Sequence, residues 1–273
     1  MYDDFPVRWN DYFGKALVRF DFSKESATIY SQNINALHEI IYLVTLSRVG
    51  KALDLRGFHR IHAMSAIIKN VSVICSMHMG NGKTSFLLES LKDANTVWLS
   101  DDSPLIARSG QAFSFPLRIG VTSSWLEQHR ASSPHLDFSQ MYEIERMKYG
   151  KKYLLPIGAI SNPISAKSVA PQLILLGAKN ASACQVKSIS AWRAFPILFL
   201  NLGIGLGLPM MREYFFEPGL KSPVNIIKIF CSRMLTVLRL MRNARFAYAQ
   251  LSPDPSHNLK VFCSFLETNF PQQ

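Results

Sequence analysis

The residues whose chemistry is easiest to recognise lie in one short segment, Met77-His-Met-Gly-Asn-Gly-Lys-Thr84, which follows an apolar run from Val71 to Cys75. Small residues in the middle of such a segment let backbone N–H groups close around a phosphate. Lys83 can reach the outer phosphates of a nucleotide, and the Thr84 hydroxyl is placed to ligate Mg²⁺. We therefore predict a nucleotide-binding loop at a strand-to-helix turn, formed by Gly80, Asn81, Gly82, Lys83, Thr84 and Ser85.

The loop departs from the full phosphate-binding pattern at its first position, which is usually glycine and is here Met77. The chain must either turn there without a left-handed glycine or turn differently. The competing interpretation is that Gly-Asn-Gly-Lys-Thr occurs by chance in a surface turn.

Two carboxylates follow the loop in the sequence, at a position that would suit phosphoryl transfer. Helical spacing from Ser85 to Leu91 is followed by a short apolar strand, Thr96 to Leu99, and then by Asp101 and Asp102. In such a unit we expect the second strand to lie parallel beside the first, which brings its carboxylates to the bound phosphates. One carboxylate can then hold the metal while the other accepts the proton of an attacking hydroxyl, although the pair could instead only cap the following turn.

These residues, taken together, resemble the HPr kinase/phosphorylase family, including its shorter homologues, some of which are kinases that modify peptides. The resemblance is clearest over residues 55–120 and is carried by Gly57 to Ala63, the Lys83-Thr84 loop, the Asp101-Asp102 pair, Gly110, and Phe115 to Arg118. A weaker echo lies at Arg146 to Lys152 and in the final helix, and the first fifty residues show none.

The resemblance implies an α/β fold with a P-loop nucleotide-binding core of the HPr kinase/PEP carboxykinase-like type, with a mixed sheet and packed helices. Residues 55–273 would form the catalytic domain, and residues 1–54 would supply N-terminal bracing strands and a helix. The Gly-rich signature that accompanies phosphorylase activity has no counterpart here, which argues against the reverse reaction and against the sugar-transport phosphocarrier as a required partner.

The resemblance also implies roles for individual residues. Lys83 and Thr84 match the phosphate and magnesium positions, Asp102 or its neighbour Asp101 matches the catalytic acid/base, and His62 matches a histidine before the loop strand. We accordingly expect Thr84 and Asp101 at the metal and Asp102, Asp101, His62 and Lys83 in catalysis. The secondary candidates for phosphate or substrate are Arg118, Arg146 and Lys148, although the basic group around Arg146 would equally suit a solvated turn.

Composition agrees with a folded catalytic unit. The chain has 273 residues, of which 48% are hydrophobic and 18% charged, enough to bury a large core. The acidic residues near Met1 do not resemble a secretory signal, so we expect a cytoplasmic protein.

The apolar stretch from Ala194 to Met211 is interrupted by glycines and prolines. It is interpreted as buried core without a transmembrane segment, with Gly203 to Gly207 as a backbone crossing point. The four cysteines are interpreted as buried thiols: Cys75, Cys184, Cys231 and Cys263.

Positive charge is concentrated in the second half. Residues 1–136 hold 14 basic and 12 acidic side chains, whereas residues 137–273 hold 16 and 7, so +9 of the net +11 lies in the second half. A positive cleft would concentrate a nucleoside triphosphate and an acidic or phosphorylated substrate. Nucleic acid is the competing partner, but the basic residues are dispersed and no nucleic-acid-binding motif is recognisable.

The rest of the chain is expected to form a framework. We predict strands at 15–22, 27–30, 153–157 and 171–176, and helices at 34–49, 224–245 and 257–266. The helix at 224–245 is expected to pack on the sheet through an apolar face that includes Phe230, with Ser232 on the opposite, polar face. A membrane-surface role is the alternative for this helix. The loop at 161–171 could serve as a substrate flap. His59 and His62 suit a strand better than a zinc pair, and His78 could touch a phosphate or face solvent.

The sequence thus predicts an ATP-dependent, Mg²⁺-requiring kinase acting on a hydroxyl, with serine of a peptide or small protein favoured. A small-molecule kinase and a catalytically impaired ATP-sensing module are the alternatives. A homo-oligomer is compatible with the sequence.

Overall fold

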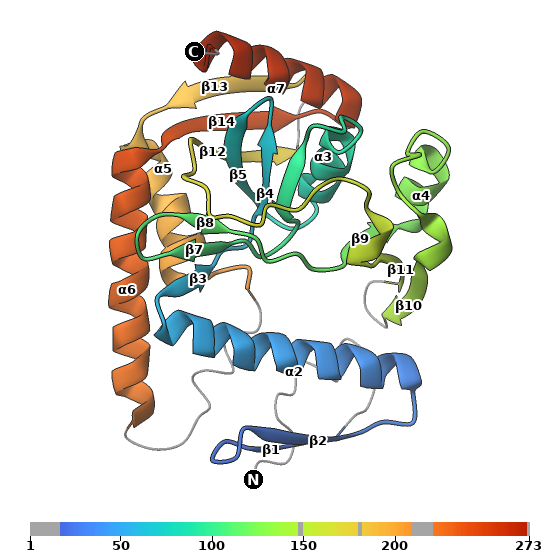
Figure 1. Cartoon of the computed structure of the whole chain (residues 1–273), viewed down its shortest axis with the longest axis vertical. Helices are drawn as coiled ribbons and strands as arrows, with labels where there is room; N and C mark the ends of the chain where they lie inside the picture. Colours follow the sequence, from blue (N-terminus) through green and yellow to red (C-terminus); the bar gives the residue numbers. More distant parts are fainter. Residues whose placement is uncertain (1–16, 147–149, 180–181, 209–220, 272–273) are drawn as a thin grey trace.

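The fold is α/β and is built on a six-stranded mixed sheet with helices packed on it (Figure 1). The computed structural model describes residues 17–146, 150–179, 182–208 and 221–271. Along the sheet the strands are β13 (Gln185–Ile189), β14 (Arg245–Leu251), β12 (Leu173–Lys179), β5 (Val71–Met77), β4 (Met64–Ile68) and β6 (Val97–Ser100). Strands β14, β12 and β5 are parallel, whereas β13 and β4 are antiparallel to their neighbours, and β6 is antiparallel to β4.

The central strands are buried on both faces, and their side chains alternate between two cores. In β12, Leu173 and Leu175 enter one core while Ile174 and Leu176 enter the other. The first core is covered by α3 (Lys83–Ser90) and α7 (Pro255–Asn269), the second by α5 (Ala191–Leu198), the π-helical segment η3 (Phe199–Ile204) and α6 (Lys221–Asn243). This arrangement follows from the strand period of two, because an uninterrupted apolar run then supplies both faces of a sheet.

Smaller elements surround one end of the large sheet. The helix α2 (Ile34–Leu55) runs between the hairpin of β1 (Leu17–Asp21) and β2 (Ser26–Tyr30) and the rest of the molecule (Figure 1). One three-stranded sheet contains β3 (Phe58–Arg60), β7 (Leu105–Ala107) and β8 (Ala112–Phe113); the other contains β9 (Ile119–Thr122), β10 (Tyr142–Arg146) and β11 (Gly150–Leu155). The remaining helices of the described residues are α4 (Ser123–His129), η1 (Phe138–Gln140) and η2 (Ile157–Ala159).

Most predicted elements are present, with shifted ends. The N-terminal strand pair and helix are confirmed, although the helix continues to Leu55. The predicted strand at 153–157 overlaps β11 only at residues 153–155, and β11 belongs to a small sheet. Strand β14 was not predicted, although it lies in the large sheet. No helix in the described ranges combines the length and the apolar character needed to cross a bilayer.

Three predictions about the framework are wrong. Cys231 is exposed on α6 and Cys263 is half-buried, whereas Cys75 and Cys184 are buried as expected. Segment 161–171 is not a flap, because its backbone pairs with Trp98 and Ala112 and none of its residues lines the cavity described below. On α6 the expected faces are reversed at two positions: Ser232 is buried and Phe230 is exposed.

Candidate functional site

The loop between β5 and α3 turns at its glycines and not at Met77. Gly80 and Gly82 have φ of +82° and +88°, the left-handed region in which a side chain would be strained. Met77 is the last residue of β5, pairs with Gly177 of β12 and is buried. The missing first glycine is therefore explained by a longer strand, and the backbone reverses only after Met77.

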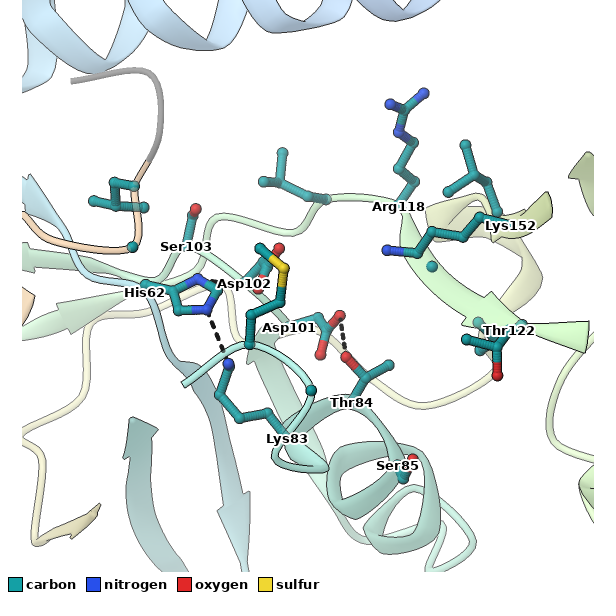
Figure 2. A pocket seen from close by; sticks show the side chains of 18 of the residues that line it. His62, Lys83, Thr84, Ser85, Asp101, Asp102, Ser103, Arg118, Thr122 and Lys152 are labelled. Atoms are coloured by element: carbon teal, nitrogen blue, oxygen red, sulfur yellow. Dashed lines mark hydrogen bonds and ion pairs between the residues drawn. The ribbon is translucent and has the colours of Figure 1, made fainter. Parts of the chain in front are cut away.

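Lys83 points back into this loop and contacts His62. Its Nζ donates to the main-chain oxygen of Met77 over 2.7 Å and lies 2.9 Å from Nε2 of His62 (Figure 2). On the other side of the ring, Nδ1 of His62 lies 3.4 Å from Oδ1 of Asp102. Burial lowers the pKa of both Lys83 and His62. A neutral His62 that accepts from Lys83 through Nε2 carries its proton on Nδ1, where the proton faces Asp102.

Gly207 packs against the ring of His62. A Cβ built on Gly207 would lie 3.1 Å from Cδ2 of His62, and this glycine has a φ of +88°. The backbone crossing predicted in the Gly203 to Gly207 segment thus includes a close approach of the chain to a candidate site residue.

The two aspartates differ in their surroundings. Asp101 is buried, and its Oδ2 accepts a hydrogen bond from Oγ1 of Thr84 over 3.1 Å (Figure 2). Burial raises the pKa of Asp101 to about 7, and the neighbouring charge of Asp102 acts in the same direction. The side chain of Asp102 is 58% exposed. Asp101 is therefore a buried group that resists ionisation, whereas Asp102 is an accessible carboxylate.

The buried carboxylate of Asp101 fits a divalent cation. Its Oδ1 has no hydrogen-bond partner among the described residues, and such a buried orphan acceptor is costly unless something satisfies it. Mg²⁺ prefers carboxylate and hydroxyl oxygens, and the Thr84 hydroxyl is adjacent. Thr84 and Asp101 thus satisfy the chemical requirement for the predicted metal pair.

The sheet brings Asp101 to the loop by a different route from the one predicted. Strand β6 does not lie beside β5, because β4 is inserted between them and is antiparallel to both. Strands β5 and β6 still run in the same direction, so their carboxyl ends meet at one edge of the sheet. The expected proximity of the loop and the carboxylates is present, but the expected pairing of the two strands is wrong.

A cavity of about 620 Å³ lies in front of these residues. One wall is formed by the loop, Lys83, Thr84, Ser85 and the two aspartates. The opposite wall comes from α2, with Glu39, Tyr42, Leu43 and Leu46. The N-terminal segment therefore supplies part of the candidate site and does more than brace it.

The secondary basic candidates have different outcomes. Arg118 lines the cavity, but its guanidinium is directed toward α2, where it pairs with Glu39 and lies 3.7 Å from the ring centroid of Tyr42 (Figure 2). Arg146 ends β10, and its side chain, like Lys148, lies outside the part of the chain that the structure describes. Lys152 lines the cavity beside Gly120, and its positive charge partly offsets the rise that burial causes in the pKa of Asp101.

Sequence reasoning missed several cavity residues. Lys179, which lines the cavity, ends β12, and β12 pairs in parallel with β5. Its position could have been inferred, because parallel neighbours end at the same edge of a sheet as the loop. Glu39 and Tyr42 carried no such signal, since the angle at which α2 crosses the site depends on tertiary packing.

The arrangement gathers a loop of backbone donors, a buried lysine, a hydroxyl paired with a buried carboxylate, and an exposed carboxylate beside a histidine. Such a set can bind a polyphosphate, hold a divalent cation and accept a proton. No protein-family model matches this sequence, and no curated protein matches it either.

Proposed function

We propose that this protein is an ATP-dependent kinase that transfers the γ-phosphate to a hydroxyl, with serine of a peptide or small protein as the favoured acceptor. The observation that carries the proposal is the hydrogen bond of 3.1 Å between Thr84 and the buried Asp101, directly at the start of a helix that follows a glycine-turned loop. A hydroxyl and a carboxylate in this position serve the metal that accompanies a nucleoside triphosphate.

The loop and Lys83 would bind the phosphates. Backbone N–H groups from Gly80 to Ser85 lie at the N-terminal end of α3, where the helix dipole favours negative charge. Lys83 now donates to the main-chain oxygen of Met77, and a bound phosphate would offer it a charged acceptor in place of that neutral one.

Thr84 and Asp101 would hold Mg²⁺, which when bound neutralises charge on the β- and γ-phosphates. A cation near Asp101 favours the ionised carboxylate, because it opposes the burial that raises the pKa. Asp101 is thereby assigned to the metal and not to proton transfer.

Asp102 would accept the proton of the acceptor hydroxyl. Its side chain is accessible from the cavity, and His62 holds one of its oxygens at 3.4 Å. The hydroxyl oxygen then forms a bond to the γ-phosphorus, the bond from that phosphorus to the β,γ-bridging oxygen breaks, and ADP leaves. His62 is a positioning residue that links this carboxylate to Lys83.

The α2 wall supports a peptide acceptor. Leu43, Leu46 and the ring of Tyr42 add an apolar surface opposite the phosphate loop, which suits the side chains that flank a serine. A sugar or metabolite kinase would differ only in the acceptor. The other alternative is an ATP-sensing module in which Met77 impairs catalysis. The position of Met77 at the end of β5, before the glycines that turn the loop, supports the kinase over that module.

The test is phosphate transfer from γ-labelled ATP to a library of serine-containing peptides and, in parallel, to small hydroxyl compounds. We expect labelled peptide with the wild type and a loss of at least about 100-fold in Asp102→Asn, because a positioned base contributes that much to phosphoryl transfer. Asp93→Asn, which alters an exposed carboxylate beyond α3, is the matched control. Tight ATP binding without transfer to any hydroxyl would assign the protein to the sensing class.

A further inference from the structure

Helix α6 presents an apolar stripe on the side that faces away from the core. Along the helix, Val224, Ile227, Leu235 and Leu238 are 63%, 64%, 47% and 51% exposed, and Cys231 is exposed between them. At about 100° per residue these positions fall on one side of the helix. The core-facing side carries the buried residues Ile229, Arg233, Thr236, Val237 and Leu240.

An exposed apolar stripe of this length calls for a partner. A surface helix normally places polar side chains opposite its core-facing side, and contiguous apolar surface on a monomer marks an interaction site. The stripe from Val224 to Leu238 spans roughly 20 Å of helix at about 1.5 Å per residue.

The charges on α6 itself are all positive. Lys228 and Arg242 are exposed on the same side of the helix, and α6 contains no acidic residue. Between Lys151 and Pro253 the sequence holds 13 basic residues against two acidic ones, Glu213 and Glu217. The partner must therefore be anionic as well as apolar.

We propose that α6 is an interfacial helix that docks the protein onto an anionic membrane surface. Aliphatic side chains flanked by Lys and Arg match the combination of acyl-chain boundary and acidic headgroups that a bilayer presents. A second copy of the chain would bring cations against cations. A protein partner would need an acidic groove shaped to a convex helix, whereas a bilayer adapts to one.

The neighbouring helix and the position of the site are consistent with this docking. Helix α5 packs against α6 and carries Trp192, which is 76% exposed and of a residue type that favours the membrane interface. Helices α6 and α3 cover opposite faces of the large sheet, and Figure 1 shows α6 along one edge of the molecule with α3 on the other side of the sheet. Contact through the outer side of α6 therefore leaves the β5–α3 loop open.

The test is co-sedimentation of the full chain with vesicles. Phosphatidylcholine vesicles are compared with the same vesicles containing about 30 mol% phosphatidylserine, a content that gives a negative surface potential. We expect binding only to the anionic vesicles. Two double variants test the two contributions: Ile227→Gln with Leu238→Gln removes apolar area, and Lys228→Gln with Arg242→Gln removes charge. Each should weaken vesicle binding by roughly tenfold or more.

The matched control is Ile34→Gln with Ile41→Gln, which removes two exposed isoleucines, 64% and 48% accessible, from α2. It should bind vesicles like the wild type, and all variants should keep the wild-type midpoint of urea unfolding.

Failure of the wild type to bind anionic vesicles, or equal loss in the α2 control, would overturn the proposal. If the wild type does not bind vesicles but forms a dimer that Ile227→Gln with Leu238→Gln dissociates, the stripe would be assigned to a second copy of the chain. If the wild type is a monomer and does not bind vesicles, an acidic protein would be the remaining occupant. None of these results depends on ATP binding.

Discussion

At the scale of single residues, the different roles that we propose for Asp101 and Asp102 rest on their surroundings. One carboxylate is buried against Thr84, and the other is exposed beside His62. Two adjacent groups of one type could thus perform different tasks, because burial raises the pKa of Asp101 whereas Asp102 is open to the cavity. The sequence predicted the pair and its two tasks, and the burial of Asp101 against Thr84 supports the proposal that Asp101 takes the metal and Asp102 the proton.

The first prediction is that Asp101→Asn raises the Mg²⁺ concentration needed for ATP binding by roughly tenfold or more, since it removes a charged ligand from a hard cation. Titration of Mg²⁺ at fixed ATP, followed by calorimetry, measures this. Asp102→Asn should leave the Mg²⁺ titration unchanged. An unchanged titration in Asp101→Asn, with a shift in Asp102→Asn, would reverse the assignment.

At the scale of elements, the sequence predicted what is local and failed on what is not. The apolar run of β5, the glycines of the loop and the spacing of α3 are adjacent in the chain, so their order could be predicted directly. The insertion of β4 between β5 and β6 depends on contacts among strands, which the spacing of one strand does not encode. Likewise, Arg233 was not predicted to be buried, because its partner Asp54 is far away in the chain and lies on α2.

A substitution at Met77 tests whether this residue serves strand β5 and not the phosphate loop. We expect Met77→Gly to lower the free energy of unfolding by about 2–4 kcal/mol, because a buried side chain is lost and glycine weakens a strand. It should not raise ATP affinity. Urea unfolding and calorimetry measure the two quantities, with the exposed Met79 changed to Gly as the control. A gain in ATP affinity would mean that the loop does need a glycine at position 77.

Helices α2 and α6 are tied together by a buried polar network that should respond to pH. Asp54 accepts from Arg233, and the ring of His59 lies 2.8 Å from Asp54 through Nδ1 and 2.8 Å from Ser232 through Nε2. Burial lowers the pKa of His59 below its usual 6.5, so below that pH the unfolded chain holds a proton that the folded chain lacks. Stability is therefore lost as pH falls below about 6.5.

We expect His59→Gln to flatten this loss, because glutamine does not titrate. The measurement is the free energy of urea unfolding between about pH 5 and 8, the range in which histidine changes charge. Changing the exposed His38 to Gln is the control. A pH profile of His59→Gln that is as steep as that of the wild type would show that His59 does not contribute to it.

At the scale of the whole molecule, the N-terminal helix and the candidate catalytic region share a cavity. Arg118 pairs with the buried Glu39 of α2, and its guanidinium covers Tyr42. The sequence suggested a boundary after residue 54 and a phosphate contact for Arg118. The ion pair between Arg118 and Glu39 joins the two segments across that boundary.

Arg118→Met should therefore destabilise the fold by about 3–5 kcal/mol, because it removes the guanidinium that faces the buried carboxylate of Glu39. Adding Glu39→Leu should restore much of that loss, and ATP affinity should stay close to that of the wild type in the double variant. Thermal unfolding and calorimetry on the four members of this cycle measure the coupling. A large fall in ATP affinity in the double variant would make Arg118 a phosphate ligand, as the sequence first suggested.

The most direct measurement for the central claim is calorimetric binding of ATP with Mg²⁺ to the wild type, to Lys83→Ala and to Lys92→Ala, whose lysine pairs with Glu89 on α3. We predict one ATP per chain, a loss of roughly 10- to 150-fold in Lys83→Ala from the missing charged hydrogen bond, and wild-type affinity in Lys92→Ala. Equal binding by the wild type and Lys83→Ala, or no binding by the wild type, would contradict the assignment of a nucleotide site to this loop.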